Sequence, residues 1–355
     1  MRNNKTCRHC VNDKTVRNIK FDENGICNFC NSYFKHYDEL HDYDNLRELF
    51  LKKLRSDKPH KYDVALGFSG GKDSTYVLYM LKNVYGLHVK AFTLDNGFLS
   101  GEAKTKIDRL VKEFGVEHEY VVCDESLLKE MYKYIVTKYL SPCIACSFLG
   151  YAVMINYATK IDAAVGVHGR SFPQMFRNYA DDEDDFFKPF IESGIRDDGT
   201  DADIFATVLN KIEKLVDKKL AEKIKQNLLG DALKDGFRPF LGYFLYHPYD
   251  KDEIIKFLES NTSWRVESEE EHFDCLIHHG ALYLKNLVAR RSHLMPEYSV
   301  MVREKTMTRE EALKKLAVNE NKAVSESELK QLCDYADISY PKLMFKARLY
   351  SKRWW

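Results

Sequence analysis

The pattern of apolar and polar residues predicts a regular alternation of strands and helices from residue 62 to about 250. Short runs rich in β-branched and aromatic residues predict strands at 62–68, 88–97, 117–123, 162–169 and 238–250. Between them, amphipathic segments predict helices at 74–86, 101–115 and 125–140, and a helix that ends at Tyr157. Strands that alternate with helices are joined by right-handed crossovers and form a parallel sheet. We therefore expect an α/β fold with a doubly wound parallel sheet.

The segments that flank this alternation differ from it in character. The first 36 residues are short and polar and carry closely spaced cysteines. Residues 180–236 open with an acidic run and continue as a lysine-rich helical stretch, which indicates an insertion. We expect three parts: a small unit at 1–36, the α/β domain at 37–260 with its insertion, and a mainly helical C-terminal region at 261–355.

The net charge and the hydropathy of the chain argue against nucleic-acid and membrane partners. The 54 Lys and Arg residues balance 54 Asp and Glu residues, so the chain lacks the broad cationic field that is typical of nucleic-acid binders. We therefore expect a small-molecule or carrier-bound substrate, and a tRNA substrate is less expected. The apolar stretches fall short of the ~20 residues that span a bilayer, and the charged N-terminus has no apolar signal region. The sequence thus predicts a cytoplasmic protein without a membrane partner.

The nine cysteines include three Cys-x-x-Cys pairs, a spacing more typical of metal binding in a reducing compartment than of disulfides. Two of the pairs, Cys7 with Cys10 and Cys27 with Cys30, are separated by 16 residues that contain the turn-forming segment FDENG. Four thiolates can close a tetrahedral Zn²⁺ site, and such a site is structural because no coordination position stays open. Four buried free thiols are the alternative interpretation.

A glycine-rich loop, Ser69-Gly70-Gly71-Lys72-Asp73-Ser74, connects the first predicted strand to the next helix. Its glycines allow a sharp turn and a close approach of a ligand, and the free N–H groups at the helix start attract an anion. It is not a Walker A loop, because Leu66 stands where that loop has its first glycine and Asp73 follows the lysine. The sequence predicts a phosphate-binding loop, with a plain glycine turn as the alternative.

This loop resembles the signature of the PP-loop ATP pyrophosphatases. Members of that family cleave ATP between the α- and β-phosphates, transfer AMP to a substrate oxygen and release pyrophosphate. The segment Asp95-Asn96-Gly97 ends the second predicted strand, at the sheet edge where such folds bind ligands, and is a candidate contact to adenosine. The resemblance implies Mg²⁺ as the shielding ion, a catalytic role for Asp73, and ATP binding by Ser69, Gly70, Gly71, Lys72, Asp73, Ser74 and Thr75.

The third cysteine pair, Cys143 and Cys146, follows Pro142 at the start of a predicted helix on the same sheet edge. A helix N-terminus lowers the pKa of a thiol, which suits redox chemistry, persulfide chemistry or metal ligation. Together with Gly166 and His168, which we assign to the cofactor site, the pair resembles the PP-loop enzymes that thiolate tRNA bases. That branch uses a [4Fe-4S] cluster. Three cysteines hold three of its irons, and the fourth iron is open to the sulfur that is transferred.

The resemblance to this branch implies a third cluster ligand. We assign it to Cys275, in the segment HFDCLIHH, and give the three ligands a catalytic role. Cys123, at the end of the third predicted strand, is the competing assignment, and Cys333 is expected to be an ordinary buried thiol. A structural or disulfide-forming pair at 143 and 146 is the alternative to a cluster.

The match to the tRNA thiolation enzymes is incomplete. The segment after His168, GRSFPQMFRN, lacks the paired acidic residues that typically follow, and no second zinc finger is evident. Over most of its length the chain is similar to the N-acetyl sugar amidotransferases, in the segments FDENGICNFC, SGGKDSTYV, LDNG and LYHPYDKDEI. Those enzymes take ammonia from a glutaminase partner, and a thiol pair at 143 and 146 is not expected of them.

The cysteines therefore decide between sulfur and ammonia. We expect an ATP-dependent sulfurtransferase that adenylates a substrate oxygen and replaces it with sulfur from a [4Fe-4S] cluster, fed by a sulfur donor. The alternatives are an amidotransferase served by a glutaminase subunit, and a non-catalytic ATP-binding or sulfur-carrying subunit. The aromatic residues Trp354 and Trp355 at the C-terminus are typical of docking surfaces, so a homodimer is a further expectation.

Overall fold

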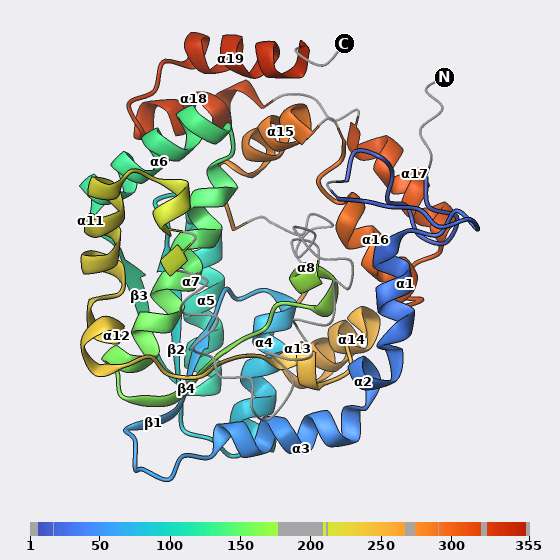
Figure 1. Cartoon of the computed structure of the whole chain (residues 1–355). Helices are drawn as coiled ribbons and strands as arrows, with labels where there is room; N and C mark the ends of the chain where they lie inside the picture. Colours follow the sequence, from blue (N-terminus) through green and yellow to red (C-terminus); the bar gives the residue numbers. More distant parts are fainter. Residues whose placement is uncertain are drawn as a thin grey trace.

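A computed structural model of the chain has a central sheet with helices on both faces (Figure 1). It describes residues 6–16, 18–176, 209–210, 212–266, 274–289, 291–320 and 325–352. The first part of the predicted insertion therefore lies outside the described residues, as do Trp354 and Trp355.

The sheet has five parallel strands: β1 (Tyr62–Gly67), β2 (Val89–Asp95), β3 (Glu117–Val122), β4 (Ala163–His168) and β5 (Phe240–Gly242). Their order in the sheet is β3-β2-β1-β4-β5. The chain thus starts in the centre, builds outward through β2 and β3, and returns to build β4 and β5 on the other side of β1. This confirms the predicted doubly wound α/β fold.

The helices fall into three groups along the chain. The N-terminal group is α1 (Asn28–Lys35), α2 (Tyr37–His41) and α3 (Tyr43–Leu54). The helices between the strands or directly after β5 are α4 (Lys72–Tyr79), the π-helix η1 (Met80–Val84), α5 (Gly101–Phe114), α6 (Glu125–Tyr139), α7 (Pro142–Lys160), α8 (Phe172–Phe176), α11 (Lys218–Leu228), α12 (Gly230–Asp235), α13 (Tyr243–Tyr246) and α14 (Lys251–Asn261). The C-terminal group is α15 (His278–Ala289), α16 (Met295–Arg303), α17 (Arg309–Glu320), α18 (Glu326–Tyr335) and α19 (Tyr340–Lys352), which confirms the predicted helical region.

Two apolar cores cover the two faces of the sheet. Side chains alternate between faces along a strand, and β1 accordingly contributes Val64 and Leu66 to one core and Ala65 to the other. The first core contains residues of α3, α4, α5 and α14, and the second contains residues of α6, α7, α11 and α12. The first core also includes Cys7, Cys10, Cys27 and Cys30, so the N-terminal segment packs as part of the same interior.

Two elements differ from the sequence prediction. The predicted strand at 238–250 has only three strand residues, and the helix α13 follows at once. All four residues of α13 are buried, and a short, wholly apolar run has the same hydrophobic pattern in a buried strand and in a buried helix. The helix predicted at 74–86 begins two residues earlier and ends in the π-helical turn η1.

Helix α7 is long and apolar enough, by length and composition, to cross a membrane, so the expectation that every apolar stretch is too short was wrong for this helix. Ser147, Tyr151 and Asn156 interrupt its apolar run. In the structure 61% of its apolar window is buried against the sheet and neighbouring helices. A core helix of a soluble protein meets the same test, so this feature is weak evidence for a membrane partner.

Candidate functional site

The strand order places a binding crevice at the centre of the sheet. Connections leave β1 and β4 toward opposite sides, and ligands of doubly wound sheets bind outside the carboxyl ends of the strands at such a switch point. Gly67 at the end of β1 pairs with His168 at the end of β4. The glycine-rich loop at 69–74, here called the phosphate loop, follows β1 and lies at this point.

Gly70 allows the phosphate loop its sharp turn. Its φ is +71°, in the left-handed region that glycine adopts at little cost. A Cβ atom at this position would lie 3.0 Å from Cγ1 of Ile107, on α5. The position therefore excludes other residues for two separate reasons, its backbone conformation and its close packing against α5.

Serine hydroxyl groups hold the phosphate loop together at its two ends. Ser69 Oγ and Ser74 Oγ are 3.1 Å apart, and the backbone N–H of Ser69 donates to Ser74 Oγ at 3.3 Å. Ser74 Oγ in turn donates to the carbonyl oxygen of Gly71 at 3.2 Å. Gly71 is the N-cap of α4 and offers no side-chain acceptor, so the first N–H groups of α4 are available to an anion.

Charged and aromatic side chains surround the loop. Lys72 Nζ lies 2.9 Å from Asp73 Oδ2 and 5.7 Å from the centre of the Tyr249 ring. The indole N–H of Trp264 donates to the carbonyl oxygen of Gly70 at 3.2 Å. Lys106 Nζ lies 4.9 Å from the Trp264 ring centre, a cation–π distance. These contacts position the loop and place two ammonium groups near it.

Three further residues predicted to bind the nucleotide, Thr75, Asp95 and Gly166, lie in different surroundings. Thr75 is fully buried, and its hydroxyl has no hydrogen-bond partner in the described part of the chain. Asp95 accepts from the ammonium of Lys104 at 2.8 Å and from the N–H of Gly97 at 3.0 Å. Gly166 lies inside β4, where a Cβ atom would meet the Phe240 ring at 2.7 Å. Packing against Phe240 thus explains why a glycine stands at position 166, independently of any ligand.

His168 is a neutral side chain at the end of β4. Burial, aided by the charge of Arg170, lowers the pKa of His168 to about 3. Its Nδ1 accepts the backbone N–H of Arg170 at 3.1 Å, so the ring proton is assigned to Nε2. His168 can therefore donate a hydrogen bond at the crevice but is not a cation at neutral pH.

Cys275 is brought to the same edge by a short antiparallel contact with the segment that follows β2. Leu99 and Cys275 form an isolated bridge. The N–H of Ser100 donates to the Asp274 carbonyl oxygen at 3.0 Å, and the N–H of Leu276 donates to the Phe98 carbonyl oxygen at 2.9 Å. The C-terminal region thus contributes a thiol to the carboxyl edge of the sheet.

Cys146, in the first turns of α7, is held by two polar side chains. The Tyr132 hydroxyl oxygen lies 3.0 Å from Cys146 Sγ, and the Asn96 amide donates to the same sulfur at 3.4 Å. Tyr132 also donates to the carbonyl oxygen of Asn96 at 3.2 Å. Asn96 follows β2 directly, so these contacts tie the start of α7 to the end of that strand.

Cys143, Cys146 and Cys275 affect one another's pKa. Burial raises the pKa of the Cys146 thiol to about 12, and Cys143 and Cys275 both add to the rise. Burial also raises the pKa of Cys275 to about 11, with contributions from Asp274 and Cys143. The helix N-terminus was expected to lower the pKa at this pair, but for Cys146 burial outweighs it. The buried thiol is therefore a poor nucleophile unless a metal displaces its proton.

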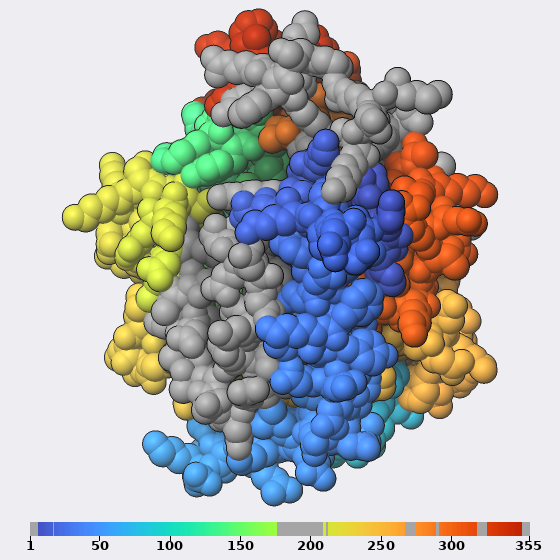
Figure 2. All heavy atoms as spheres, turned by 45° about the vertical axis from the view of Figure 1, so that its right-hand side comes forward, coloured from blue at the N-terminus to red at the C-terminus, as the bar shows by residue number. Residues whose placement is uncertain are grey.

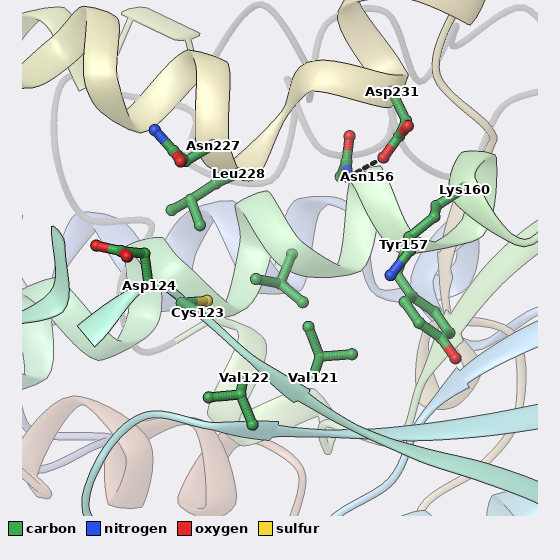
Figure 3. A pocket seen from close by; sticks show the side chains of 11 residues that line it. Val121, Val122, Cys123, Asp124, Asn156, Tyr157, Lys160, Asn227, Leu228 and Asp231 are labelled. Carbon is green, nitrogen blue, oxygen red and sulfur yellow. Dashed lines mark hydrogen bonds between the residues drawn. The ribbon is translucent and has the colours of Figure 1, made fainter. Parts of the chain in front are cut away.

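Cys123, the competing cluster ligand, lies in a different setting. It lines a pocket between the end of β3 and the helices α7, α11 and α12, together with Asn156, Asn227 and Asp231 (Figure 3). Burial raises the pKa of Cys123 to about 11, and Asp95 is the charge that contributes. Cys275, in contrast, shares electrostatic contacts with the 143/146 pair.

The four N-terminal cysteines form a compact group, here called the cysteine knuckle (Cys7, Cys10, Cys27 and Cys30). All four thiols are fully buried and lie within 4.8 Å of one another. The Sγ atoms of Cys7 and Cys30 are 3.9 Å apart, and those of Cys10 and Cys27 are 3.7 Å apart. The backbone N–H groups of Cys10 and Cys27 both point to Cys7 Sγ.

These distances fit a single tetrahedral ion. With a Zn–S bond of about 2.3 Å, tetrahedral geometry places two sulfurs about 3.8 Å apart. An iron–sulfur cluster inserts several atoms between its thiolates and needs them farther apart. In the described part of the chain, the cysteine knuckle is the only group of three or more His, Cys, Asp or Glu side chains whose possible ligand atoms all lie within 4.8 Å of one another. Cys143, Cys146 and Cys275 are thus more widely spaced than a one-ion site requires.

The N-terminal segment that carries the cysteine knuckle lies against the C-terminal region, with blue atoms beside orange ones in Figure 2, and two arginines join them. The buried Arg303, at the end of α16, donates to Cys30 Sγ at 3.7 Å. Arg309, at the start of α17, donates to the carbonyl oxygens of Cys10 and Cys7 at 3.1 and 3.2 Å. Four thiolates around a divalent ion carry a net charge of −2, and Arg303 offsets part of it inside the protein.

Replacing Arg303 with methionine, which keeps most of the side-chain volume, is expected to weaken metal binding about 10- to 100-fold, the usual effect of losing an outer-shell partner. Competition with a chromophoric chelator measures this affinity. The control is Arg55→Met, since Arg55 is exposed at the end of α3. Equal metal affinities for the two variants would contradict the role given to Arg303.

Asn96 was predicted, with its neighbours Asp95 and Gly97, as a contact to adenosine, and in the structure its amide binds the sulfur of Cys146. Sequence reasoning missed Tyr132 and Arg170. Arg170 follows His168 by two positions, so it was within reach of the strand-end rule. Tyr132 is one apolar position of an amphipathic helix and carries no such signal. His272 and Arg290, polar residues of the C-terminal segment, lie outside the described residues.

Comparison with known proteins gives distant matches. No protein-family model matches the chain. The uncharacterized protein MJ1638 of Methanocaldococcus jannaschii is 29% identical over 132 residues, which are 35% of this chain and 49% of that protein. The chain spans about half the length of the curated relatives it matches.

Two solved structures align with larger parts of the chain. The U34-tRNA thiolase NcsA from Methanococcus maripaludis, solved with its [4Fe-4S] cluster, is 17% identical over 90% of each chain, with a TM-score of 0.39. The NH3-dependent NAD synthetase from Campylobacter jejuni is 12% identical over 54% of this chain and 95% of its own, with a TM-score of 0.30. Neither is a sugar amidotransferase, so that resemblance stays a prediction. The chain has a doubly wound α/β fold with a glycine-rich loop at its switch point and a four-cysteine site able to hold a metal.

Proposed function

We propose that this protein is an ATP-dependent sulfurtransferase that uses the crevice at the switch point of its sheet. The observation that carries the proposal is that a phosphate loop and a set of thiols lie at the same edge of the sheet. The phosphate loop follows β1, and the contacts of Cys146 and Cys275 tie both thiols to the residues that follow β2. A loop that binds phosphates and a set of thiols near it suit activation of an oxygen followed by its replacement with sulfur.

In the proposed reaction, an oxygen of the acceptor bonds to the α-phosphorus of ATP, the bond to the bridging oxygen breaks, and pyrophosphate leaves. A sulfide then bonds to the acceptor carbon, and AMP leaves with the former acceptor oxygen. The N–H groups at the start of α4, Lys72 and the hydroxyls of Ser69 and Ser74 hold the departing pyrophosphate. Mg²⁺ shields the phosphates.

Cys143, Cys146 and Cys275 would hold a [4Fe-4S] cluster, which supplies an open iron for sulfide when bound. Their wider spacing and their half-buried positions at the sheet edge fit such a group better than a single ion. Asn96 and Tyr132 orient the sulfur of Cys146 through hydrogen bonds of 3.4 and 3.0 Å. The cysteine knuckle would hold Zn²⁺ and serve the fold. We further propose a small-molecule or carrier-bound acceptor and a cytoplasmic location.

The cluster assignment predicts a specific pattern of cysteine variants. Protein purified without oxygen is expected to contain about four irons and four sulfides and to absorb near ~400 nm. Alanine at position 143, 146 or 275 removes a ligand and is expected to abolish iron retention. The controls are Cys123→Ala and Cys333→Ala, which remove buried thiols outside the group. Wild-type protein without iron, or a Cys275→Ala variant that keeps the cluster, would overturn the assignment.

The nucleophile is tested separately. Turnover supported by sulfide but not by ammonia is expected for the sulfurtransferase, whereas turnover with ammonia would favour an amidotransferase that depends on a glutaminase. An intact ATP-binding protein with no turnover on either would favour a non-catalytic subunit.

A further inference from the structure

Arg170 holds an unusual position between the phosphate loop and α7. Its neighbour Gly169 packs directly on the loop: a Cβ atom at Gly169 would lie 3.0 Å from the backbone atoms of Asp73 and Ser74. On the other side, Arg170 Nη1 donates to the hydroxyl of Tyr151, on α7, at 2.6 Å. Arg170 thus joins the phosphate loop, through its neighbour Gly169, to the helix that carries the thiol pair.

The guanidinium is fixed in place. Its central carbon lies 4.8 Å from the centre of the Tyr151 ring, so the side chain stacks on the ring and also bonds its hydroxyl. The backbone N–H of Arg170 is bound to Nδ1 of the buried His168 at 3.1 Å. Backbone and side chain are thus both held before any ligand arrives, which lowers the entropy that binding would cost.

The charge of Arg170 is not neutralised by a carboxylate within the described ranges. Salt bridges there pair other cations, such as Arg238 with Asp162 at 3.3 Å, but none includes Arg170. Only one of its five N–H donors is used by a side chain in that part of the structure. A half-buried guanidinium whose other donors bind no described side chain suits a bidentate contact to an oxyanion.

The stripe of α7 that Tyr151 occupies leads to the thiol pair. Cys143, Ser147 and Tyr151 are spaced by four residues, so they follow one another along one side of the helix. Two helical turns, or about 12 Å, separate Cys143 from Tyr151 along the axis. An oxyanion on Arg170 would therefore lie between the phosphate loop and the thiols, where the reacting groups must meet.

We propose that Arg170 binds an oxyanion in this space, either a phosphate group of the nucleotide or an anionic group of the acceptor. The proposal rests on the function proposed above and adds to it the charge of the group that this site recognises. Tyr151 acts as a positioning residue that holds the guanidinium toward the crevice.

Calorimetry on the full-length protein tests the proposal without turnover. In the first arm, magnesium pyrophosphate and AMP are titrated separately into wild type, Arg170→Gln, Arg170→Lys and Tyr151→Phe. In the second arm, protein saturated with magnesium α,β-methylene ATP is titrated with inorganic phosphate and with acetate. Arg238→Gln is the matched control, because Arg238 precedes β5 at the opposite end of the sheet.

Because Arg170→Gln removes charged hydrogen bonds to the oxyanion, we expect it to lower the affinity for that oxyanion about tenfold or more. Arg170→Lys and Tyr151→Phe should lower this affinity less, and Arg238→Gln should leave it unchanged. Weaker pyrophosphate binding with unchanged AMP binding assigns the site to the nucleotide. Unchanged pyrophosphate binding with weaker phosphate or acetate binding in the second arm assigns it to the acceptor.

Binding of all probes within twofold of wild type in Arg170→Gln and Tyr151→Phe would overturn the proposal and leave the proposed function standing. Wild-type protein that binds neither pyrophosphate nor nucleotide would overturn both. Thermal melts of each variant show that it is folded, and the milder Tyr151→Phe variant provides the comparison if Arg170→Gln is unstable.

Discussion

Replacing Gly70 with alanine is expected to lower the affinity for MgATP on the order of 100-fold, because the phosphate loop can no longer keep its shape. Alanine at a φ of +71° costs about 1–2 kcal/mol. Its Cβ would also meet Ile107 at 3.0 Å, so the loop or α5 must shift. The N–H groups at the start of α4 would then no longer converge on one phosphate. Calorimetric titration with a non-hydrolysable ATP analogue measures the change.

The matched control for this variant is Gly86→Ala. Gly86 also has a positive φ, +68°, but no atom of the described residues lies within 4 Å of its Cβ position. It carries the same backbone cost at a site remote from the carboxyl edge of the sheet. Equal ATP affinities in the two variants, with both folded, would show that the loop does not bind the nucleotide.

Disrupting the cysteine knuckle is expected to have the largest effect on stability. Cys27→Ser removes a metal ligand from a fully buried group, and loss of the ion should lower the free energy of unfolding on the order of 5 kcal/mol or more, because metal binding and folding are coupled. The effect should reach α16 and α17, since Arg303 and Arg309 bind the knuckle directly. Metal analysis and denaturant unfolding measure the two quantities.

Cys333→Ser provides the comparison for the knuckle variant. Cys333 is equally buried, in the second apolar core and outside the knuckle. Its replacement should cost only the burial of a hydroxyl group, about 1–3 kcal/mol, and leave the metal content unchanged. Full metal content in Cys27→Ser, or equal destabilisation by the two variants, would rule out a metal-bound knuckle.

The fold was predictable because local patterns decide it. Alternating apolar runs and amphipathic segments specified the strands β1 to β4 and the helices between them, and the position of the phosphate loop followed from the end of β1. The strand predicted at 238–250 was right only for its first part, β5. The helix α13 was not predicted, since a buried aromatic run such as Tyr243–Tyr246 has no distinguishing period.

Long-range contacts limited the prediction of the site. The bridge between Leu99 and Cys275 joins segments that are far apart in sequence, and no local pattern specifies that pairing. The hydrogen bond of Tyr132 to Cys146 and the stacking of Arg170 on Tyr151 likewise depend on how helices pack. Spacing identified the thiols, whereas only the packed structure shows which of them are neighbours.

The most direct test of the account follows the fate of ATP labelled at its α-phosphate. The full-length protein, prepared without oxygen, is incubated with the labelled ATP, Mg²⁺, sulfide and the low-molecular-weight fraction of a cell extract that supplies acceptors. The account predicts AMP and pyrophosphate in equal amounts, with formation lost in Gly70→Ala and retained in Gly86→Ala. ADP and phosphate as the products, or AMP that forms equally in the two glycine variants, would contradict it.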